Sequence, residues 1–168
     1  VIEHMRALLR GKRPELGPVP IEELVRKVVA LVRHDAAARH VDLQTQVPHD
    51  GAAVRAGPVQ LQQVLLNLVF NGLDALEQVP PRSRRLVISA RLLTSTQVEL
   101  VVRDTGPGLS KEALARVFEP FHTTKAHGMG MGLAICRSLV ESMDGSIDAG
   151  NQMDGGAAFR IVLPQAGA

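Results

Sequence analysis

Residues 60–78 read QLQQVLLNLVFNGLDALEQ, and the rest of the chain is organised around this stretch. Apolar residues recur in it at helical spacing and predict a helix with one buried side: Leu61, Val64, Leu65, Leu68, Gly72, Ala75 and Leu76. A second stripe consists of short amides and ends in one carboxylate: Gln60, Gln63, Asn67, Asn71 and Asp74. An ordinary solvated face would carry Lys and Glu. This stripe is therefore either a polar surface without lysine or a binding face for a polar ligand or a hydrated cation.

The composition is that of a globular protein with an aliphatic core. The chain has 168 residues, 45% of them hydrophobic, which suffices for one domain with a sizeable core. The single cysteine excludes an internal disulfide. No apolar run approaches the ~18 residues of a membrane span. Aromatic residues make up 2% of the chain and the net charge is +2, so little is available to stack on bases, and a nucleic-acid partner is not expected.

Helical and alternating patterns predict the remaining elements. Helices are expected at residues 21–39, 110–117 with Ser110 as N-cap, and 133–143 with Gly145 at the C′ position. Strands are expected at residues 41–47, 85–93, 98–103, 146–149 and 157–163, with a hairpin at 94–97 and a short strand at 52–56 beside 41–47. Paired strands that outnumber helices indicate an α+β fold, a mixed sheet with helices on one face.

The first twenty residues differ in character from the rest. Residues 1–13 are expected to be the basic end of a helix, and prolines space out an extended linker at 14–20. The main domain is expected over residues 21–168. Because the chain does not begin with Met, we expect residues 1–13 to be cut from something larger.

Four stretches carry residues suited to binding a nucleotide. Asn67 and Asn71 are four residues apart, on one helix face, where amide oxygens can ligate Mg²⁺. Residues 104–108, DTGPG, place a carboxylate at a strand end, where it can accept a hydrogen bond from an exocyclic amine; a plain turn is the alternative.

The third stretch is residues 118–125, FEPFHTTK, which predict a flap that brings Thr and Lys to a polyanion, or a loop pinned to the core by two Phe residues. The fourth is residues 128–133, GMGMGL, directly before a helix. Its glycines allow main-chain N–H groups to point at phosphate oxygens, although its spacing is neither the dinucleotide motif nor a P-loop.

Other polar residues predict no site. Cys136 is expected in the core, and His34, His40 and His49 on the surface without zinc-ligand spacing. His122 and His127 are weaker candidates for nucleotide contacts. A solvated loop edge is expected for three arginines: Arg82, Arg84 and Arg85.

Taken in order, these stretches resemble the ATP-binding catalytic domain of bacterial sensor histidine kinases, in the Bergerat-fold superfamily of gyrase, heat-shock chaperone, histidine kinase and mismatch-repair ATPases. Residues 67–75 resemble the N box, 104–108 the first glycine box, 118–121 the F box and 128–133 the second glycine box. Residues 155–159 resemble the glycine-then-strand ending of that domain. The departures are mild: Gly72 stands where Ala is usual, and Met occupies two positions between the glycines.

The resemblance implies a two-layer α/β sandwich with a mostly antiparallel sheet, about three helices and an ATP lid. It implies ATP and Mg²⁺ as ligands, Asn71 and Asn67 at the metal, and Asp74 in the nucleotide pocket. Asp104 would bind the adenine amine, with Gly106 and Gly108 shaping the adenine pocket. Residues 118–125 would form the lid, and the glycines of the second box would hold the phosphates. The predicted lid and phosphate contacts are Phe118, Thr123, Thr124, Lys125, Gly128, Met129, Gly130, Met131, Gly132 and Leu133. Lys125 would also be catalytic, together with Asn67 and Asn71.

The resemblance also implies a reaction. Hydrolysing members of the superfamily carry a Glu base where this chain has Asn67, and an amide cannot take a proton. Phosphoryl transfer to a histidine on a separate dimerisation domain is therefore expected, within a homodimeric parent kinase that serves a response regulator. The domain would be cytoplasmic, with any membrane anchor of the parent upstream of Val1. Three alternatives stay open: an ATPase, a related serine kinase, and a non-catalytic nucleotide-binding module.

Overall fold

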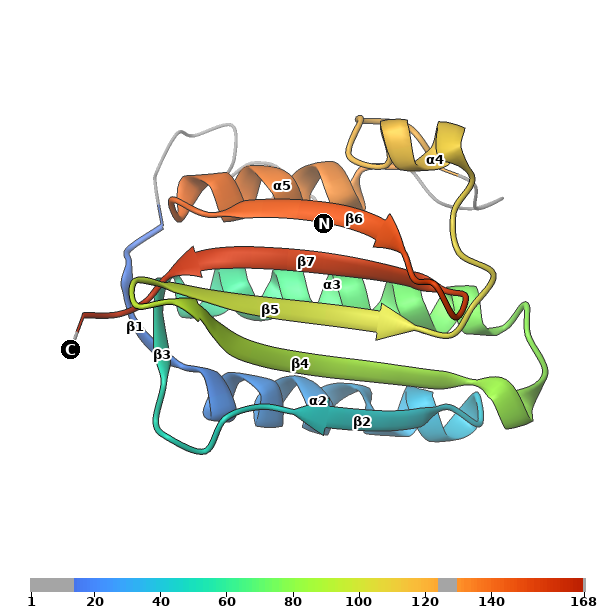
Figure 1. The fold of residues 1–168 in the computed structure, drawn as a ribbon, viewed down its shortest axis with the longest axis horizontal. Coiled ribbons are helices and arrows are strands. Elements are labelled where there is room, and N and C mark those ends of the chain that lie inside the picture. Colours follow the sequence, from blue (N-terminus) through green and yellow to red (C-terminus); the bar gives the residue numbers. More distant parts are fainter. Residues whose placement is uncertain (1–13, 124–129, 168) are drawn as a thin grey trace.

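The fold consists of a layer of helices on one face of a five-stranded sheet (Figure 1). The structure is a computed structural model and describes residues 14–123 and 130–167. The sheet has the order β2-β4-β5-β7-β6, in which β2 pairs with β4 in parallel and the other pairs are antiparallel. The strands are β2 (Asp42–Gln46), β4 (Arg85–Thr94), β5 (Gln97–Asp104), β7 (Ala157–Pro164) and β6 (Ser146–Asn151). The predicted α+β class and mixed sheet are confirmed.

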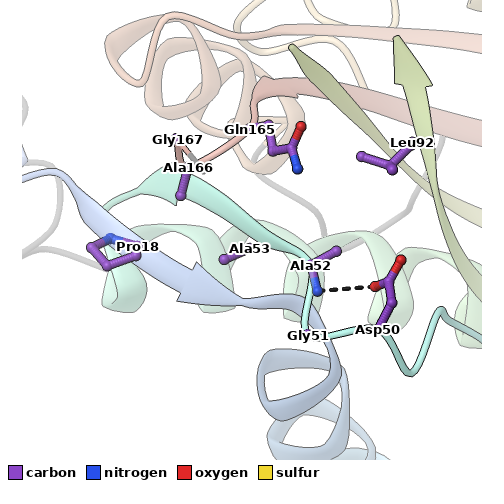
Figure 2. A pocket seen from close by; sticks show the side chains of 9 residues that line it. All are labelled: Pro18, Asp50, Gly51, Ala52, Ala53, Leu92, Gln165, Ala166 and Gly167. Carbon is purple, nitrogen blue, oxygen red and sulfur yellow. Dashed lines mark hydrogen bonds between the residues drawn. The ribbon is translucent and has the colours of Figure 1, made fainter. Parts of the chain in front are cut away.

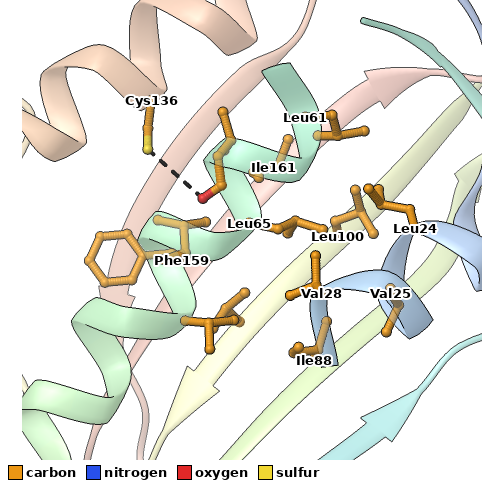
Figure 3. Close-up of a cluster of buried hydrophobic side chains, with 14 of the residues drawn as sticks. Leu24, Val25, Val28, Leu61, Leu65, Ile88, Leu100, Cys136, Phe159 and Ile161 are labelled. Atoms are coloured by element: carbon orange, nitrogen blue, oxygen red, sulfur yellow. Dashed lines mark hydrogen bonds between the residues drawn. The ribbon is translucent and has the colours of Figure 1, made fainter. Parts of the chain in front are cut away.

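Three helices cover one face of this sheet: α2 (Ile21–Ala38), α3 (Pro58–Leu76) and α5 (Gly132–Ser142). The stretch that opened the prediction, α3, lies between the other two and contacts both. Its apolar stripe is buried except for the half-buried Ala75, and Figure 3 shows Leu61 and Leu65 on the side of α3 that faces Leu100 and Ile161 of the sheet. Each fully buried aliphatic side chain contributes roughly 1.5–3 kcal/mol to folding, so this interface is the main source of stability.

A smaller sheet corrects one predicted pairing. The strand β3 (Ala53–Ala56) pairs antiparallel with β1 (Gly17–Pro20), inside the stretch predicted as a linker, and not with β2. Prolines at 18 and 20 lack the main-chain N–H, which suits them to a short edge strand. A four-residue strand pattern does not specify its partner, and here the buried Val54 also bridges to Gln165 near the end of the chain.

The end of α5 differs from the prediction. Asp144, not Gly145, takes the left-handed conformation, with φ of 59°. The N–H groups of Asp144 and Gly145 then donate to the Glu141 and Val140 carbonyl oxygens at 3.1 and 3.0 Å. Gly145 is required for space, because a Cβ there would lie 2.6 Å from both Leu163 Cδ2 and Val162 O.

A second correction concerns Arg84, which was predicted to be solvated. Its guanidinium donates to three main-chain carbonyl oxygens, Arg39 at 2.7 Å, Val79 at 3.0 Å and Glu77 at 3.3 Å. Helix ends leave carbonyl groups without partners in the helix, and α2 and α3 both end here. The forked guanidinium ties the two ends together, while Arg82 and Arg85 are exposed as predicted.

The remaining elements are short. The predicted N-cap is confirmed in α4 (Lys111–Arg116), where Ser110 Oγ accepts from Ala113 N at 3.0 Å. A 3-10 turn, η1 (Pro81–Ser83), follows α3. Across residues 14–123 and 130–167, no helix has the length and apolar character needed to span a bilayer.

Candidate functional site

The polar stripe of α3 faces the start of α5 at Asn67. Its Nδ2 donates to Gly132 O at 3.0 Å and lies 3.4 Å from Cys136 Sγ. Asn71 lies one turn further along α3 and is half-buried. The structure therefore brings the predicted N box and second glycine box into direct contact.

Asp104 is the last residue of β5, and its side chain is 5% exposed. Its Oδ1 accepts from Gly106 N at 2.8 Å and from Ala157 N at 3.4 Å. Burial raises the pKa of this carboxyl group, and these two hydrogen bonds only partly oppose that shift. The other carboxylate oxygen accepts no hydrogen bond within the described ranges, so it is available to a donor on a ligand.

Two glycines leave room beside Asp104. A Cβ at Gly106 would lie 2.8 Å from Asp104 Oδ1 and 3.3 Å from Ala75 O, so a side chain would fill the space between β5 and α3. Gly156 has φ of +90°, and a Cβ there would lie 1.9 Å from Asp104 O. The backbone around the carboxylate therefore tolerates only glycine at position 156.

Two polar residues at the end of β6 and the start of the β6–β7 turn were not predicted from the sequence: Asn151 and Gln152. The Asn151 amide accepts from Leu109 N at 2.8 Å and donates to Leu109 O at 2.6 Å, and Gln152 Nε2 donates to Asp104 O at 3.1 Å. These bonds hold the DTGPG loop, including Gly108 with φ of +75°, against the turn. Glycines at both ends of residues 150–156 indicate a turn between two strands, and no spacing in the sequence identifies this contact.

The second glycine box leads into α5. Gly130 has φ of +66°, and its carbonyl oxygen accepts from Phe121 N at 2.9 Å. The helix begins at Gly132, and Met131 at its N-cap gives no side-chain hydrogen bond to the first turn. The N–H groups of that turn therefore have no side-chain cap, and the helix N-terminus favours an anion. Leu133 is half-buried in the same turn.

The predicted flap is anchored by one phenylalanine, not two. The Phe118 ring packs edge-on against Phe159, with centroids 6.3 Å apart and planes at 89°. Phe121 is 78% exposed, so its ring is not packed in the core, and its backbone takes the left-handed conformation with φ of 63°. Thr123 is exposed. Predicted contacts that lie outside the described residues are Thr124, Lys125, His127, Gly128 and Met129.

Asp74 is held from the α2 side. Its Oδ1 accepts from Arg39 Nη1 at 2.7 Å, and the same guanidinium group lies 3.0 Å from Glu77. The hydrogen bond to Asp74 raises the pKa of Arg39. The carboxylate predicted to line the nucleotide pocket is thus already paired with the end of α2.

A cavity of about 300 Å³ lies elsewhere, between the small sheet, Leu92 and the end of the chain (Figure 2). Its Asp50 carboxylate accepts from Ala52 N at 3.0 Å, which closes a local turn. None of the predicted nucleotide-binding residues lines this cavity.

The site described above lies within a region that matches a known protein family. Residues 56–167 match the family described as histidine kinase-, DNA gyrase B- and HSP90-like ATPase. The chain belongs to this ATPase family. The resemblance inferred from the four motifs is thereby confirmed.

Two curated relatives are sensor proteins by name. The chain is 39% identical over 165 residues to the C4-dicarboxylate transport sensor protein DctB of Pseudomonas aeruginosa, covering 97% of this chain and 27% of DctB. It is 36% identical over 165 residues to the sensor protein TdiS of Thauera aromatica, covering 98% of this chain and 30% of TdiS. The chain thus spans less than a third of the length of these two relatives.

Solved structures show the same fold. The catalytic domain of histidine kinase ThkA, in a nucleotide-free form, superposes with a TM-score of 0.79 at 28% identity, covering 89% of this chain and 95% of that one. Full-length ShkA in complex with AMPPNP gives a TM-score of 0.83 at 31% identity, covering 99% of this chain and 35% of ShkA. The fold of a histidine kinase catalytic domain is therefore present over nearly the whole chain.

Proposed function

We propose that this chain is the Mg²⁺–ATP-binding catalytic domain of a sensor histidine kinase, which transfers the γ-phosphoryl group of ATP to a histidine on a separate dimerisation domain. The main observation in support of the proposal is Asp104. Its carboxylate is buried, one of its oxygens accepts no hydrogen bond within the described residues, and the space beside it would be filled by any side chain at Gly106. Such an acceptor suits the exocyclic amine of adenine. The ShkA complex with AMPPNP supports a nucleotide ligand for this fold.

The residues of this chain fit an adenine ring next to Asp104. Gly106 leaves the space between the carboxylate and Ala75 unfilled, so a flat ring can approach both α3 and β5. Gly108 and the Asn151 amide hold the neighbouring loop in place. The protein would hold the ring by shape and by one charged hydrogen bond.

The phosphates and Mg²⁺ would lie towards the start of α5. When bound, Mg²⁺ neutralises phosphate charge and keeps part of its water shell, so one or two amide oxygens suffice to anchor it. Asn71 and Asn67 would supply those oxygens. Residues of the second glycine box, Gly128, Met129, Gly130, Met131, Gly132 and Leu133, would bind the phosphates, and the glycines would do so through main-chain N–H groups. Phe118, Thr123, Thr124 and Lys125 would belong to the lid.

Transfer to a supplied histidine fits this site better than hydrolysis. A water needs a base, and Asn67 carries an amide whose nitrogen already donates to Gly132 O at 3.0 Å. The remaining catalytic task is to position the γ-phosphate, for which Lys125, Asn67 and Asn71 are the candidates. The parent kinase would be a homodimer that passes the phosphoryl group to a response regulator, with this domain in the cytoplasm.

Calorimetric titration of AMPPNP into the chain, with and without Mg²⁺, tests the proposal. We expect Mg²⁺ to strengthen binding, and Asn71→Ala to remove about tenfold in affinity only when Mg²⁺ is present. Gln62→Ala, on the same helix but outside the predicted site, is the control and should change neither value. Absence of nucleotide binding by the unmodified chain would refute the proposal.

A second assay separates a kinase from an ATPase. The chain is mixed with the histidine-bearing domain of its parent and radiolabelled ATP. Label on that domain, with no phosphate release by the chain alone, is the expected outcome. Steady phosphate release without the acceptor domain would instead assign the chain to the hydrolysing branch of the family.

A further inference from the structure

The side-chain amide of Asn67 is held in one orientation by α5. Its Nδ2 lies 3.0 Å from Gly132 O and 3.4 Å from Cys136 Sγ. A carbonyl oxygen only accepts hydrogen bonds, so the nitrogen of the amide must face it and the oxygen must face elsewhere. Both N–H groups are used by these two contacts. Within residues 14–123 and 130–167, Oδ1 has no hydrogen-bond partner.

Cys136 provides one of the two contacts that hold the Asn67 amide. It is 1% exposed, and its thiol contacts α3 twice, at Asn67 Nδ2 and at the Val64 carbonyl oxygen 4.0 Å away, the dashed contact in Figure 3. Burial raises the pKa of the thiol to about 11, so it keeps its proton at neutral pH. A neutral thiol can accept weakly from the amide and donate weakly to the carbonyl oxygen, which matches both neighbours.

Gly132 provides the second contact, through its carbonyl oxygen. A Cβ at this position would lie 3.1 Å from Asn67 Nδ2 and 3.3 Å from Oδ1, closer than ordinary van der Waals contact. Any side chain at position 132 would therefore displace the amide or move α5 away from α3. The absence of a side chain at Gly132, the first residue of α5, therefore leaves room for the Asn67 amide.

We infer that Cys136 and Gly132 are positioning residues that turn the Asn67 amide so that its oxygen is the atom left for the metal or its water shell. Cys136 itself would touch neither nucleotide nor metal. Its contact transmits the position of α5, which begins at the second glycine box, to the N box of α3. The consequence for Mg²⁺ rests on the proposed function, whereas the orientation of the amide does not.

The orientation is tested first in the nucleotide-free protein. The Asn67 side-chain amide is followed by NMR in the unmodified chain and in Cys136→Ala, Cys136→Ser and Val140→Ala. Val140 is fully buried on the same helix and makes no hydrogen bond to Asn67, so its truncation controls for lost packing. We expect faster hydrogen exchange of the amide in Cys136→Ala, restoration in Cys136→Ser and no change in Val140→Ala. Equal exchange in Cys136→Ala and the unmodified chain would overturn the inference.

The consequence for the metal is tested by the gain in AMPPNP affinity on adding Mg²⁺. We expect Cys136→Ala to reduce that gain about two- to fivefold, the effect of one weak hydrogen bond. It should have no further effect in an Asn67→Ala background, because the two residues act through one contact. An unchanged gain, or an equal loss in Val140→Ala, would overturn the metal part. If the unmodified chain binds no AMPPNP, the proposed function fails, and the NMR result still decides the orientation.

Discussion

β5 carries two buried carboxylates, and replacing each by the corresponding amide should have different effects on stability and on nucleotide binding. Asp104 and Glu99 are each 5% exposed and are the buried charged residues of the described part of the chain. Asp104 accepts only from main-chain N–H groups. Glu99 lies between Arg91, at 2.7 Å, and Arg160, which also donates to it. Asp104→Asn and Glu99→Gln each remove one charge at nearly constant volume.

The first expected difference is in stability. Burial raises the pKa of Asp104, so the folded state binds the proton more tightly than the unfolded state does, and the ionised carboxylate opposes folding at neutral pH. Asp104→Asn keeps Oδ1 as an acceptor and removes that cost, so the melting temperature should be equal or higher. Glu99→Gln should lower it by roughly 3–6 °C. That shift corresponds to about 1.5 kcal/mol, the low end for hydrogen bonds to charged groups, because Arg91 is well exposed and Arg160 is only half-buried.

The second expected difference is in nucleotide binding. Asp104→Asn places an N–H group where the carboxylate oxygen would accept from adenine, so two donors would face each other. Losing a charged hydrogen bond of about 1.5–3 kcal/mol weakens AMPPNP binding roughly 10- to 150-fold. Glu99→Gln should leave the affinity within about twofold, since its two arginine partners were not among the predicted nucleotide contacts.

Calorimetric titration and thermal unfolding of the three proteins at pH 7 measure both quantities. The reasoning is refuted if Asp104→Asn lowers the melting temperature as much as Glu99→Gln does. It is also refuted if Asp104→Asn binds AMPPNP as tightly as the unmodified chain. In either case Asp104 would be a structural residue and not the adenine acceptor.

Three further outcomes are expected. Hydrogen bonds from Arg91 and Arg160 lower the pKa of Glu99 from 4.5, so the stabilisation by its carboxylate is fully present above pH 4.5 and is lost as pH falls through the lower folded-state pKa. The difference in melting temperature between Glu99→Gln and the unmodified chain should therefore shrink as pH is lowered below 4.5. Gly155 and Gly156 both have positive φ, but only Gly156 lacks room for a Cβ. Urea unfolding should therefore give about 1 kcal/mol of destabilisation for Gly155→Ala and about 3 kcal/mol for Gly156→Ala, and equal values would contradict the clash. Arg84→Ala should lower the free energy of unfolding by about 2–3 kcal/mol, because three carbonyl oxygens lose their hydrogen-bond donor. Arg82 is exposed, so Arg82→Ala should change this free energy by less than about 0.5 kcal/mol. Similar effects of the two substitutions would show that Arg84 is a solvated surface residue.

Local sequence patterns were sufficient to predict most of the helices and strands. The apolar stripe of α3 and the alternating strands were correct to within a few residues, because periodicity reflects which side of an element is buried. Ser110 was correct because an N-cap involves residues only three apart. Asp104 was identifiable as a carboxylate at a strand end before glycines, although its burial was not.

Contacts between distant segments escaped prediction. Arg84 joins the ends of two helices, and Asn151 holds a loop more than forty residues away, yet neither has a distinctive neighbour in the sequence. The partner of β3 and the outward turn of Phe121 were likewise set by surroundings that the local pattern does not contain.

The sequence by itself determined most of the elements, the class of fold and four candidate nucleotide-binding stretches, since helical and strand periods and glycine-rich turns are local properties. Only the tertiary structure decided which polar atoms are already bound within the protein and which are available to a ligand. The nitrogen of the Asn67 amide is bound to α5, one oxygen of Asp104 is bound to the backbone, and Asp74 is paired with Arg39. Hydrogen bonds require distances near 3 Å, and packing brings distant residues that close.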